Sequence, residues 1–115
     1  MVRKYVPVET KQETGRIYLD EIIYIEKNLR KTILITDTRR VAIYCGMDKI
    51  KQYMDQRFLD CHRSYLFNMD KIQRMEGQTI YLEQGYSVTL GRDRFRRGRK
   101  RYRDYLRKKK CEENL

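Results

Sequence analysis

The sequence has little of what catalysis, metal binding and membrane insertion usually require. It contains no tryptophan, one histidine (His62) and three widely spaced cysteines without a C-x-x-C pair. Such a set forms neither a disulfide framework nor a zinc site. No apolar run approaches the roughly 20 residues that span a bilayer, and the first residues lack the apolar stretch of a secretory signal. The sequence therefore predicts a cytoplasmic protein with no metal, cofactor or catalytic centre.

Positive charge is what the sequence has in excess. Its 115 residues, enough for a single domain (1–115), carry 27 Lys and Arg against 16 Asp and Glu, a net charge of +11. Residues 91–110 hold 12 of the cations and only two acids, Asp93 and Asp104, which gives this segment a net charge of +10. A fold does not need such self-repulsion. A polyanionic partner is therefore expected: nucleic acid first, an anionic membrane second and an acidic protein third.

Short runs of β-branched and aromatic residues dominate the first 90 residues and predict antiparallel strands joined by short turns. The predicted strands are residues 22–25, 32–36, 41–45, 71–75, 79–83 and 86–90. The last two form the clearest hairpin, with Gly85 at its turn. Ile25, Ile35 and Ile43 are expected in the core. The tyrosines of these runs are expected there too: Tyr24, Tyr44 and Tyr81.

Two segments have helical periodicity. Met47, Ile50 and the pair at 53–54 predict two helical turns over residues 47–54. The basic tail, residues 92–110, is also predicted to be a helix. Its sparse apolar stripe consists of Phe95, Tyr102, Tyr105 and Leu106. Only Gly98 opposes this helix, by about 1 kcal/mol.

The most specific stretch is residues 58–72, Phe-Leu-Asp-Cys-His-Arg-Ser-Tyr-Leu-Phe-Asn-Met-Asp-Lys-Ile. It resembles the signature of the LytTR DNA-binding family: an aromatic-led short strand, then His-Arg-Ser, an aromatic-apolar pair, Asn, and a strand that opens on Ile. Residues 19–26 look like the family's early strand pair. The resemblance covers about residues 4–106. The sequence departs from the family's pattern at Gly91, where a hydroxyl residue is common, and in its unusually basic C-terminus.

The resemblance implies a mainly β fold of small antiparallel sheets packed in tandem, with one short internal helix and a basic C-terminal helix. It also implies a bacterial transcription regulator, or the effector domain of a response regulator, that binds double-stranded DNA. Loops and strand ends would enter successive major grooves, with a pair of copies, such as a homodimer on DNA, on tandem repeat sites. The candidate DNA contacts are Asn28, Arg30, Lys31, Thr32, His62, Arg63, Arg92, Arg94 and Arg96.

Residue chemistry supports three of these positions separately. Arg30, Arg63 and Arg92 each lie where a predicted strand gives way to a loop. Arginine can make a bidentate fork to guanine and also pairs with phosphate. For the basic tail, contact with the DNA backbone is the first interpretation and a solvated helix the second. A membrane face is disfavoured because the tail has no Trp and its stripe is mostly Tyr.

Other functions remain as alternatives. Asp60, His62 and Ser64 share one face of a strand, but a catalytic triad is normally assembled from distant segments, so His62 is expected to pack or to contact phosphate. Cys61 is expected in the core, and Asn68 at a turn. An RNA-binding β-domain is the alternative to DNA binding, although no RRM-type aromatic motif is present. A nuclease would need a carboxylate cluster, and the acids are scattered.

Overall fold

The computed structural model describes residues 2–113, and β-strands dominate this part of the chain. The strands are β1 (Tyr5–Glu9), β2 (Thr14–Tyr18), β3 (Ile22–Asn28), β4 (Lys31–Thr36), β5 (Arg40–Ile43), β6 (Phe58–His62), β7 (Tyr65–Asn68), β8 (Ile72–Glu76), β9 (Thr79–Leu82) and β10 (Ser87–Thr89). The helices are α1 (Met47–Lys51) and α2 (Arg92–Glu113). Three short 3-10 turns occur at Leu19–Glu21, Met69–Lys71 and Glu83–Gly85.

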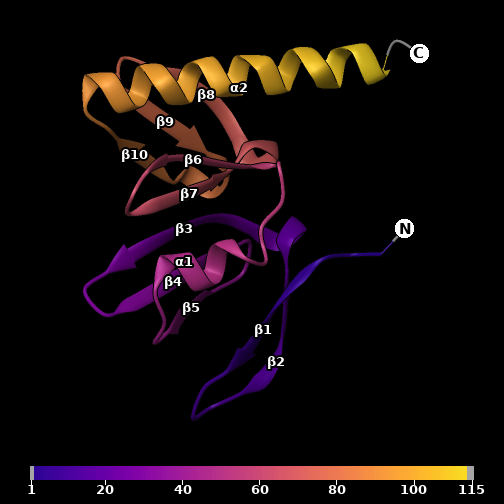
Figure 1. The fold of residues 1–115 in the computed structure, drawn as a ribbon, viewed down its shortest axis with the longest axis vertical. Helices are drawn as coiled ribbons and strands as arrows, with labels where there is room; N and C mark the ends of the chain where they lie inside the picture. Colours follow the sequence, from indigo (N-terminus) through magenta and orange to yellow (C-terminus); the bar gives the residue numbers. More distant parts are fainter. Residues whose placement is uncertain (1, 114–115) are drawn as a thin grey trace.

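The sheets are stacked along the long axis of the molecule (Figure 1). A five-stranded antiparallel sheet in the order β5-β4-β3-β7-β6 forms the middle layer. The β1–β2 hairpin and α1 pack on one side of it, and the sheet β10-β9-β8 with α2 packs on the other. The predicted meander is β3-β4-β5, and the predicted C-terminal hairpin is β9–β10 with β8 paired in front of it. The mainly β class of tandem small sheets is confirmed.

The middle sheet is buried on both faces, so the protein has two hydrophobic cores. The core toward α2 includes Ile23, Ile35, Leu59, Phe67, Ile80, Leu82 and Phe95. The core toward the β1–β2 hairpin includes Val6, Ile17, Ile25, Leu34, Ile50 and Leu66. Strands covered on both faces are apolar at successive positions. This explains why β3 and β4 were visible in the sequence as continuous apolar runs.

The first turns of α2 dock on β6 at a glycine. A Cβ built on Gly98 would lie 2.9 Å from the Sγ of Cys61, so only glycine allows this approach of helix to strand. Phe95, one turn earlier, is buried in the same core. Gly98 weakens the helix but fits this contact. Cys61 is buried as predicted, and burial raises the pKa of its thiol to about 11.

Two tyrosine hydroxyls hold the middle of α2. The Tyr102 hydroxyl donates to the carbonyl of Ile72 at 3.0 Å, and that of Tyr105 donates to the Asp70 carboxylate at 2.7 Å. The predicted stripe is wrong at Leu106, which is 48% exposed. Leu106 lines a shallow surface hollow with Met75 and Tyr102, so its side chain lies at the margin of the core and not inside it.

Asn68 joins three segments at the start of β3. Its amide nitrogen donates to the carbonyls of Leu19 and Ile22 at 3.3 and 2.8 Å. Its amide oxygen accepts the N–H of Asp70 at 2.9 Å. The side chain is fully buried, and the predicted structural role at a turn is confirmed. Without the amide, the Ile22 carbonyl and the Asp70 N–H would lose this partner, whereas the Leu19 carbonyl would keep the backbone N–H of Ile22.

The N-terminal part of the structure differs from the expectation for residues 19–26. These residues form one 3-10 turn and most of a single strand, β3, and not a strand pair. The early pair is instead β1 and β2, which precede them. Pro7 in β1 and Gly15 in β2 are poor strand formers, so local composition concealed this hairpin.

The third predicted strand is shorter than expected. β5 ends at Ile43, an edge-strand residue that is only half-buried rather than a full core residue. Tyr44 lies beyond the strand and is 76% exposed, so its assignment to the core is wrong. Because β5 pairs with β4 on one side only, its last residues have no second strand to cover them.

Candidate nucleic-acid interface

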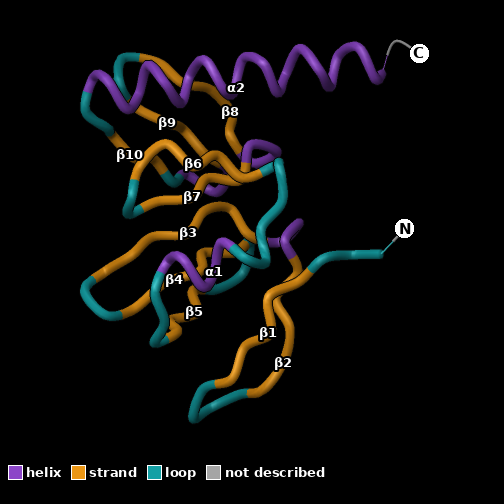
Figure 2. The backbone as a smooth tube through the Cα atoms, in the orientation of Figure 1, coloured by secondary structure: helices purple, strands orange, loops and turns teal. Residues whose placement is uncertain are grey.

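Three connections lie along one side of the molecule, at the left of Figures 1 and 2. They are residues 28–31 between β3 and β4, residues 62–65 between β6 and β7, and residues 91–92 between β10 and α2. We call these three connections the loop edge. The first two are joined directly, because the N–H of Lys27 donates to the carbonyl of Ser64 at 2.8 Å.

The start of α2 lies close to the second connection. A hollow between β6 and α2 is lined by His62 and Arg63 on one side and by Arg94, Arg97 and Arg101 on the other. Arg97 and Arg101 were not among the predicted contacts. They lie three and seven residues after Arg94 and therefore on the same helix face, so the helical period could have identified them.

The first connection is a two-residue turn with a polar rim. Asn28 pairs with Lys31 across the hairpin, and both side chains are exposed, as is that of Arg30. The Lys31 ammonium lies 5.3 Å from the centre of the Tyr44 ring. Lysine and tyrosine together thus extend this surface to the end of β5, which the assignment of Tyr44 to the core had missed.

Thr32 does not belong to this surface. It is fully buried, and its hydroxyl donates to the carbonyl of Cys45 at 2.7 Å. The bond ties β4 to the segment that follows β5. The predicted DNA contact of its side chain is therefore wrong. A one-residue step along a strand reverses the facing side, so Lys31 points outward and Thr32 inward.

His62 is held by its own turn. Its Nδ1 accepts the backbone N–H of Ser64 at 3.0 Å, so the proton of the neutral ring is on Nε2, which is left as a donor. Desolvation lowers the pKa of His62, and Arg94 and Arg63 lower it further. The ring is therefore neutral near pH 7. Asp60 pairs with Lys51 at 3.0 Å, and His62 contacts the backbone of Ser64, so the three do not form a catalytic relay.

The remaining candidates are exposed and lack carboxylate partners. Arg63, Arg92, Arg94 and Arg96 are all exposed. Among residues 2–113, no salt bridge involves them, nor Arg30 or Lys31. The cations that do form salt bridges are Arg3, Lys4, Arg39, Arg40, Lys51, Arg57, Lys71 and Lys109. Uncompensated positive charge is thus concentrated on the loop edge and α2.

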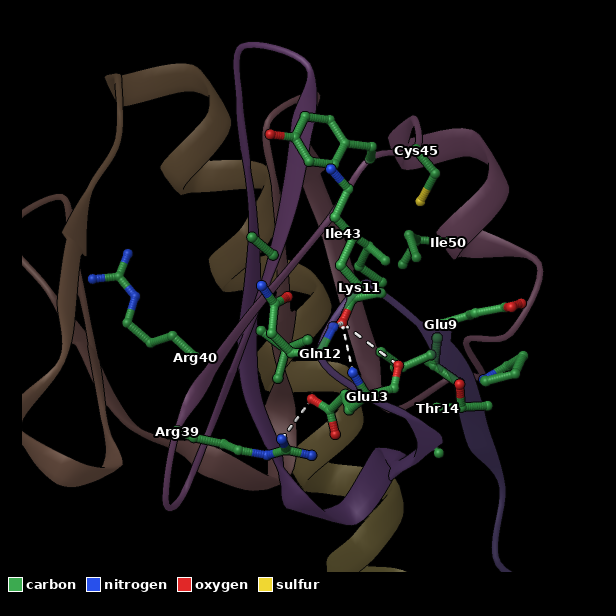
Figure 3. Close-up of a pocket in the computed structure, with 18 of the residues that line it drawn as sticks. Glu9, Lys11, Gln12, Glu13, Thr14, Arg39, Arg40, Ile43, Cys45 and Ile50 are labelled. Carbon is green, nitrogen blue, oxygen red and sulfur yellow. Dashed lines mark hydrogen bonds and ion pairs between the residues drawn. The ribbon is translucent and has the colours of Figure 1, made fainter.

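The groove between the β1–β2 hairpin and β5 has the opposite character. Figure 3 shows charges of both signs around it: Glu13 lies beside Arg39, and Glu9 and Lys11 also line the groove. Arg39 and Glu13 form an ion pair at 2.7 Å, drawn as a dashed line in the figure. Two of the four cations that line the groove are paired with carboxylates, Arg39 with Glu13 and Arg40 with Glu26, so the groove offers a polyanion less free positive charge than α2 does.

Other site classes find no support in the described residues. No three or more His, Cys, Asp or Glu side chains of residues 2–113 are grouped so that they could hold a metal ion. Within the same range, no helix has the length and apolar character needed to cross a membrane. The charged residues that line the hollow beside His62 are cations except for Asp60, which pairs with Lys51, so the hollow suits an anion.

Comparison with known proteins gives consistent matches. Accessory gene regulator protein A of Staphylococcus epidermidis is 26% identical over 84 residues, which cover 68% of this chain and 35% of the relative. The Staphylococcus aureus protein of the same name is 27% identical over 75 residues, 62% of this chain and 31% of the relative. The chain thus spans about a third of the length of these curated relatives.

A solved structure supports the fold. The LytTr DNA-binding domain of a Bacillus cereus protein described as a methyl-accepting/DNA response regulator superposes with a TM-score of 0.67. The match covers 93% of this chain and 96% of that one, at 18% sequence identity. The family model of the LytTr DNA-binding domain matches residues 12–103, from the end of the β1–β2 turn to the middle of α2. The chain therefore belongs to the LytTr DNA-binding domain family.

Proposed function

We propose that the chain binds duplex DNA sequence-specifically and regulates transcription, with the loop edge in successive major grooves and α2 along the phosphate backbone. The observation that carries the proposal is the set of exposed, unpaired cations at the loop edge. Several arginines away from this surface pair with carboxylates, as Arg39 does with Glu13, and two others lie over tyrosine rings, Arg16 over Tyr5 and Arg74 over Tyr81. Arg63 and Arg92 have no such partner among the described residues, so DNA can supply it.

The loop edge and α2 offer two kinds of contact. Arg63 projects from the short turn between β6 and β7, and Arg92 is the first residue of α2, so the backbone of each is restrained in a way that suits bidentate contact with guanine. Along α2, 12 Lys and Arg occupy residues 92–110. Such a density of charge suits phosphates, which fix position but carry no sequence information. Arg94 and Arg96 belong to this second group, together with the hollow beside His62.

The first test selects bound duplexes from a random pool and then titrates variants against the selected site. Arg63→Ala and Arg92→Ala should each weaken binding by about 1–3 kcal/mol and relax preference at one or two base positions. Both variants should melt like the parent. Lys108→Ala should weaken binding less and leave the preference intact, because a phosphate contact is read equally on all sequences.

Arg39→Ala is a matched control for these variants. It removes an arginine of equal charge from the opposite end of the sheet, where it pairs with Glu13. It should lower stability by about 0.2–1 kcal/mol and leave base preference unchanged. The proposal fails if Arg63→Ala and Arg92→Ala retain parental affinity and preference, or if they lose binding only because they unfold.

The second test separates duplex DNA from RNA and counts copies. RNA of equal length should compete poorly with the selected duplex at physiological salt. Affinity for any duplex should fall steeply as salt rises, because α2 displaces counterions. Removing residues 96–115 should weaken specific and non-specific binding alike. Two copies per selected site, on two repeats of one sequence, would support tandem binding, and a single copy on a single repeat would oppose it.

A further inference from the structure

Leu29, at the tip of the first connection, combines two features that the fold does not explain. Its backbone has a φ of 59°, in the left-handed region that branched apolar residues avoid. Its side chain is 89% exposed, so it has little to pack against. The other non-glycine residues of positive φ among residues 2–113 are polar: Gln78 and Gln84. Gln78 uses its side chain to donate to the carbonyl of Leu90.

The turn itself favours a different residue. Asn28 and Lys31 pair across the hairpin, so Leu29 and Arg30 form a two-residue turn. Such turns need a positive φ at their first central position, which glycine, asparagine and aspartate supply with little strain. Leucine is strained there and exposes apolar surface to water. Neither turn geometry nor packing therefore accounts for it, whereas a contact made on binding would.

The surroundings of Leu29 indicate the chemistry of that contact. Asn28, Arg30 and Lys31 flank it with exposed polar groups, and the backbone bond from Lys27 to Ser64 places the turn beside the second connection. In the major groove, the C5-methyl group of thymine is the apolar feature among hydrogen-bonding edges. Leu29 is an apolar tip flanked by the cations Arg30 and Lys31. This arrangement matches a thymine methyl group in a groove whose walls carry phosphates.

We propose that Leu29 is a specificity-determining residue that packs against a thymine methyl group in the DNA major groove. The inference rests on the proposed function and adds one residue and one base to it. Hydrogen-bonding arginines cannot detect a methyl group, so Leu29 gives the loop edge an independent means of distinguishing thymine from the other bases. The strained turn keeps the side chain at the tip, where it can enter the groove.

The test compares thymine with deoxyuracil, which lacks only the methyl group. Each thymine of the selected site is replaced in turn by deoxyuracil, and each duplex is titrated with the parent and with Leu29→Gly. The parent should lose about fourfold in affinity at one position, the effect expected for one buried methyl group. Leu29→Gly should bind the thymine site more weakly and no longer distinguish the two bases at that position. Leu29→Met should restore part of the discrimination.

Gln84→Gly is the matched control, because Gln84 is also exposed and has a φ of 63°, in the turn between β9 and β10. Both glycine variants should melt about 2–5 °C higher than the parent, since glycine relieves the backbone strain. Only Leu29→Gly should alter DNA binding. A lower melting temperature for Leu29→Gly would assign Leu29 a structural role and overturn the inference.

The outcomes separate this inference from the function on which it rests. A parent that selects no duplex overturns the proposed function and the Leu29 contact together. A parent that selects a site, with Leu29→Gly keeping the parental preference for thymine over deoxyuracil, overturns the Leu29 contact alone. An equal loss of affinity by Leu29→Gly on both duplexes also overturns it, because the leucine would then contact something other than the methyl group.

Discussion

The two ends of the middle sheet use polar residues in opposite ways. At one end, which we call the capped end, side chains satisfy backbone groups and one another. It consists of residues 19–21, 36–39 and 68–71. Asn68 bonds to three backbone groups there, and Lys71 lies near the carboxylates of Asp37 and Glu83. At the loop edge, by contrast, Arg63 and Arg92 are exposed without a carboxylate partner among the described residues.

This difference suggests how the chain divides stability from recognition. Side chains at the capped end already have partners, so a ligand gains little from them. The exposed arginines of the loop edge have no carboxylate partner among the described residues, so their hydrogen-bond donors are free to contact a ligand. Variants at the capped end and in the cores should therefore change folding stability, and variants at the loop edge should change binding. The predictions below test that division in order of expected effect.

Core truncation should have the largest effect. Ile25 and Ile35 are fully buried in opposite cores, so replacing either with Ala should lower the free energy of unfolding by about 2–5 kcal/mol. Ile43 is half-buried at the edge strand, and its truncation should have a smaller effect, about 0.5–1.5 kcal/mol. Urea unfolding measures all three. Equal losses at the three positions would contradict the burial described for β5.

An asparagine pair compares the two ends directly. Asn68→Ala removes the amide donor from the buried carbonyl of Ile22 and one of two donors from that of Leu19, and it should destabilise the fold by about 1–3 kcal/mol. Asn28→Ala removes the same amide from an exposed position and should change stability by less than about 0.5 kcal/mol. Thermal melts and DNA titrations of both variants give the comparison. A large destabilisation by Asn28→Ala would place a structural role at the loop edge and break the division.

Much of this fold could be predicted from sequence because the cores are built from continuous apolar runs. The runs at 22–25 and 32–36 lie in strands covered on both faces, which local composition detects well. The β1–β2 hairpin was missed because its strands contain Pro7 and Gly15, and long-range packing on the middle sheet stabilises them. Composition cannot report such packing.

The errors at single residues have a common physical cause. Thr32 was assigned by its position in the family resemblance, Tyr44 by its strand run and Leu106 by its helical spacing, but the burial of each depends on what lies opposite it. Thr32 finds a carbonyl partner, whereas Tyr44 lies beyond the end of β5 and Leu106 lies at the margin of the core. Gly98 was counted against a helix that its lack of a side chain in fact allows to dock. The unpaired state of Arg63 is likewise a tertiary property.

Gly98→Ala should affect both regions, because α2 joins them. Alanine favours the helix by about 1 kcal/mol, but its Cβ would lie 2.9 Å from the Sγ of Cys61. Overpacking of this kind should outweigh the gain and leave a net destabilisation of about 1 kcal/mol. The shifted helix should also weaken DNA binding. Cys61→Ala removes the clashing sulfur, so the double variant should recover helix docking relative to Gly98→Ala alone. If the double variant melts no higher than Gly98→Ala alone, the contact between residue 98 and Cys61 does not limit the docking of α2.

The smallest expected effect is the pH dependence contributed by His62, and it should have opposite signs for stability and for binding. Burial, Arg94 and Arg63 lower the pKa of His62 in the folded protein, whereas in the unfolded chain the group titrates near 6.5. The unfolded state therefore binds more protons in the window below about pH 6.5, so stability should be full above that pH and should decrease as the pH falls through the window. DNA phosphates beside Arg63 would act on His62 in the other direction, because a nearby anion favours the protonated ring. Affinity for the selected duplex should thus increase as the pH falls through the same window.

Melting temperatures and duplex titrations between pH 5.5 and 8, with His62→Gln as the control, measure the pH dependence of stability and of binding. If His62→Gln keeps the parental slope for binding, His62 does not approach phosphate, and the hollow between β6 and α2 should be removed from the proposed interface.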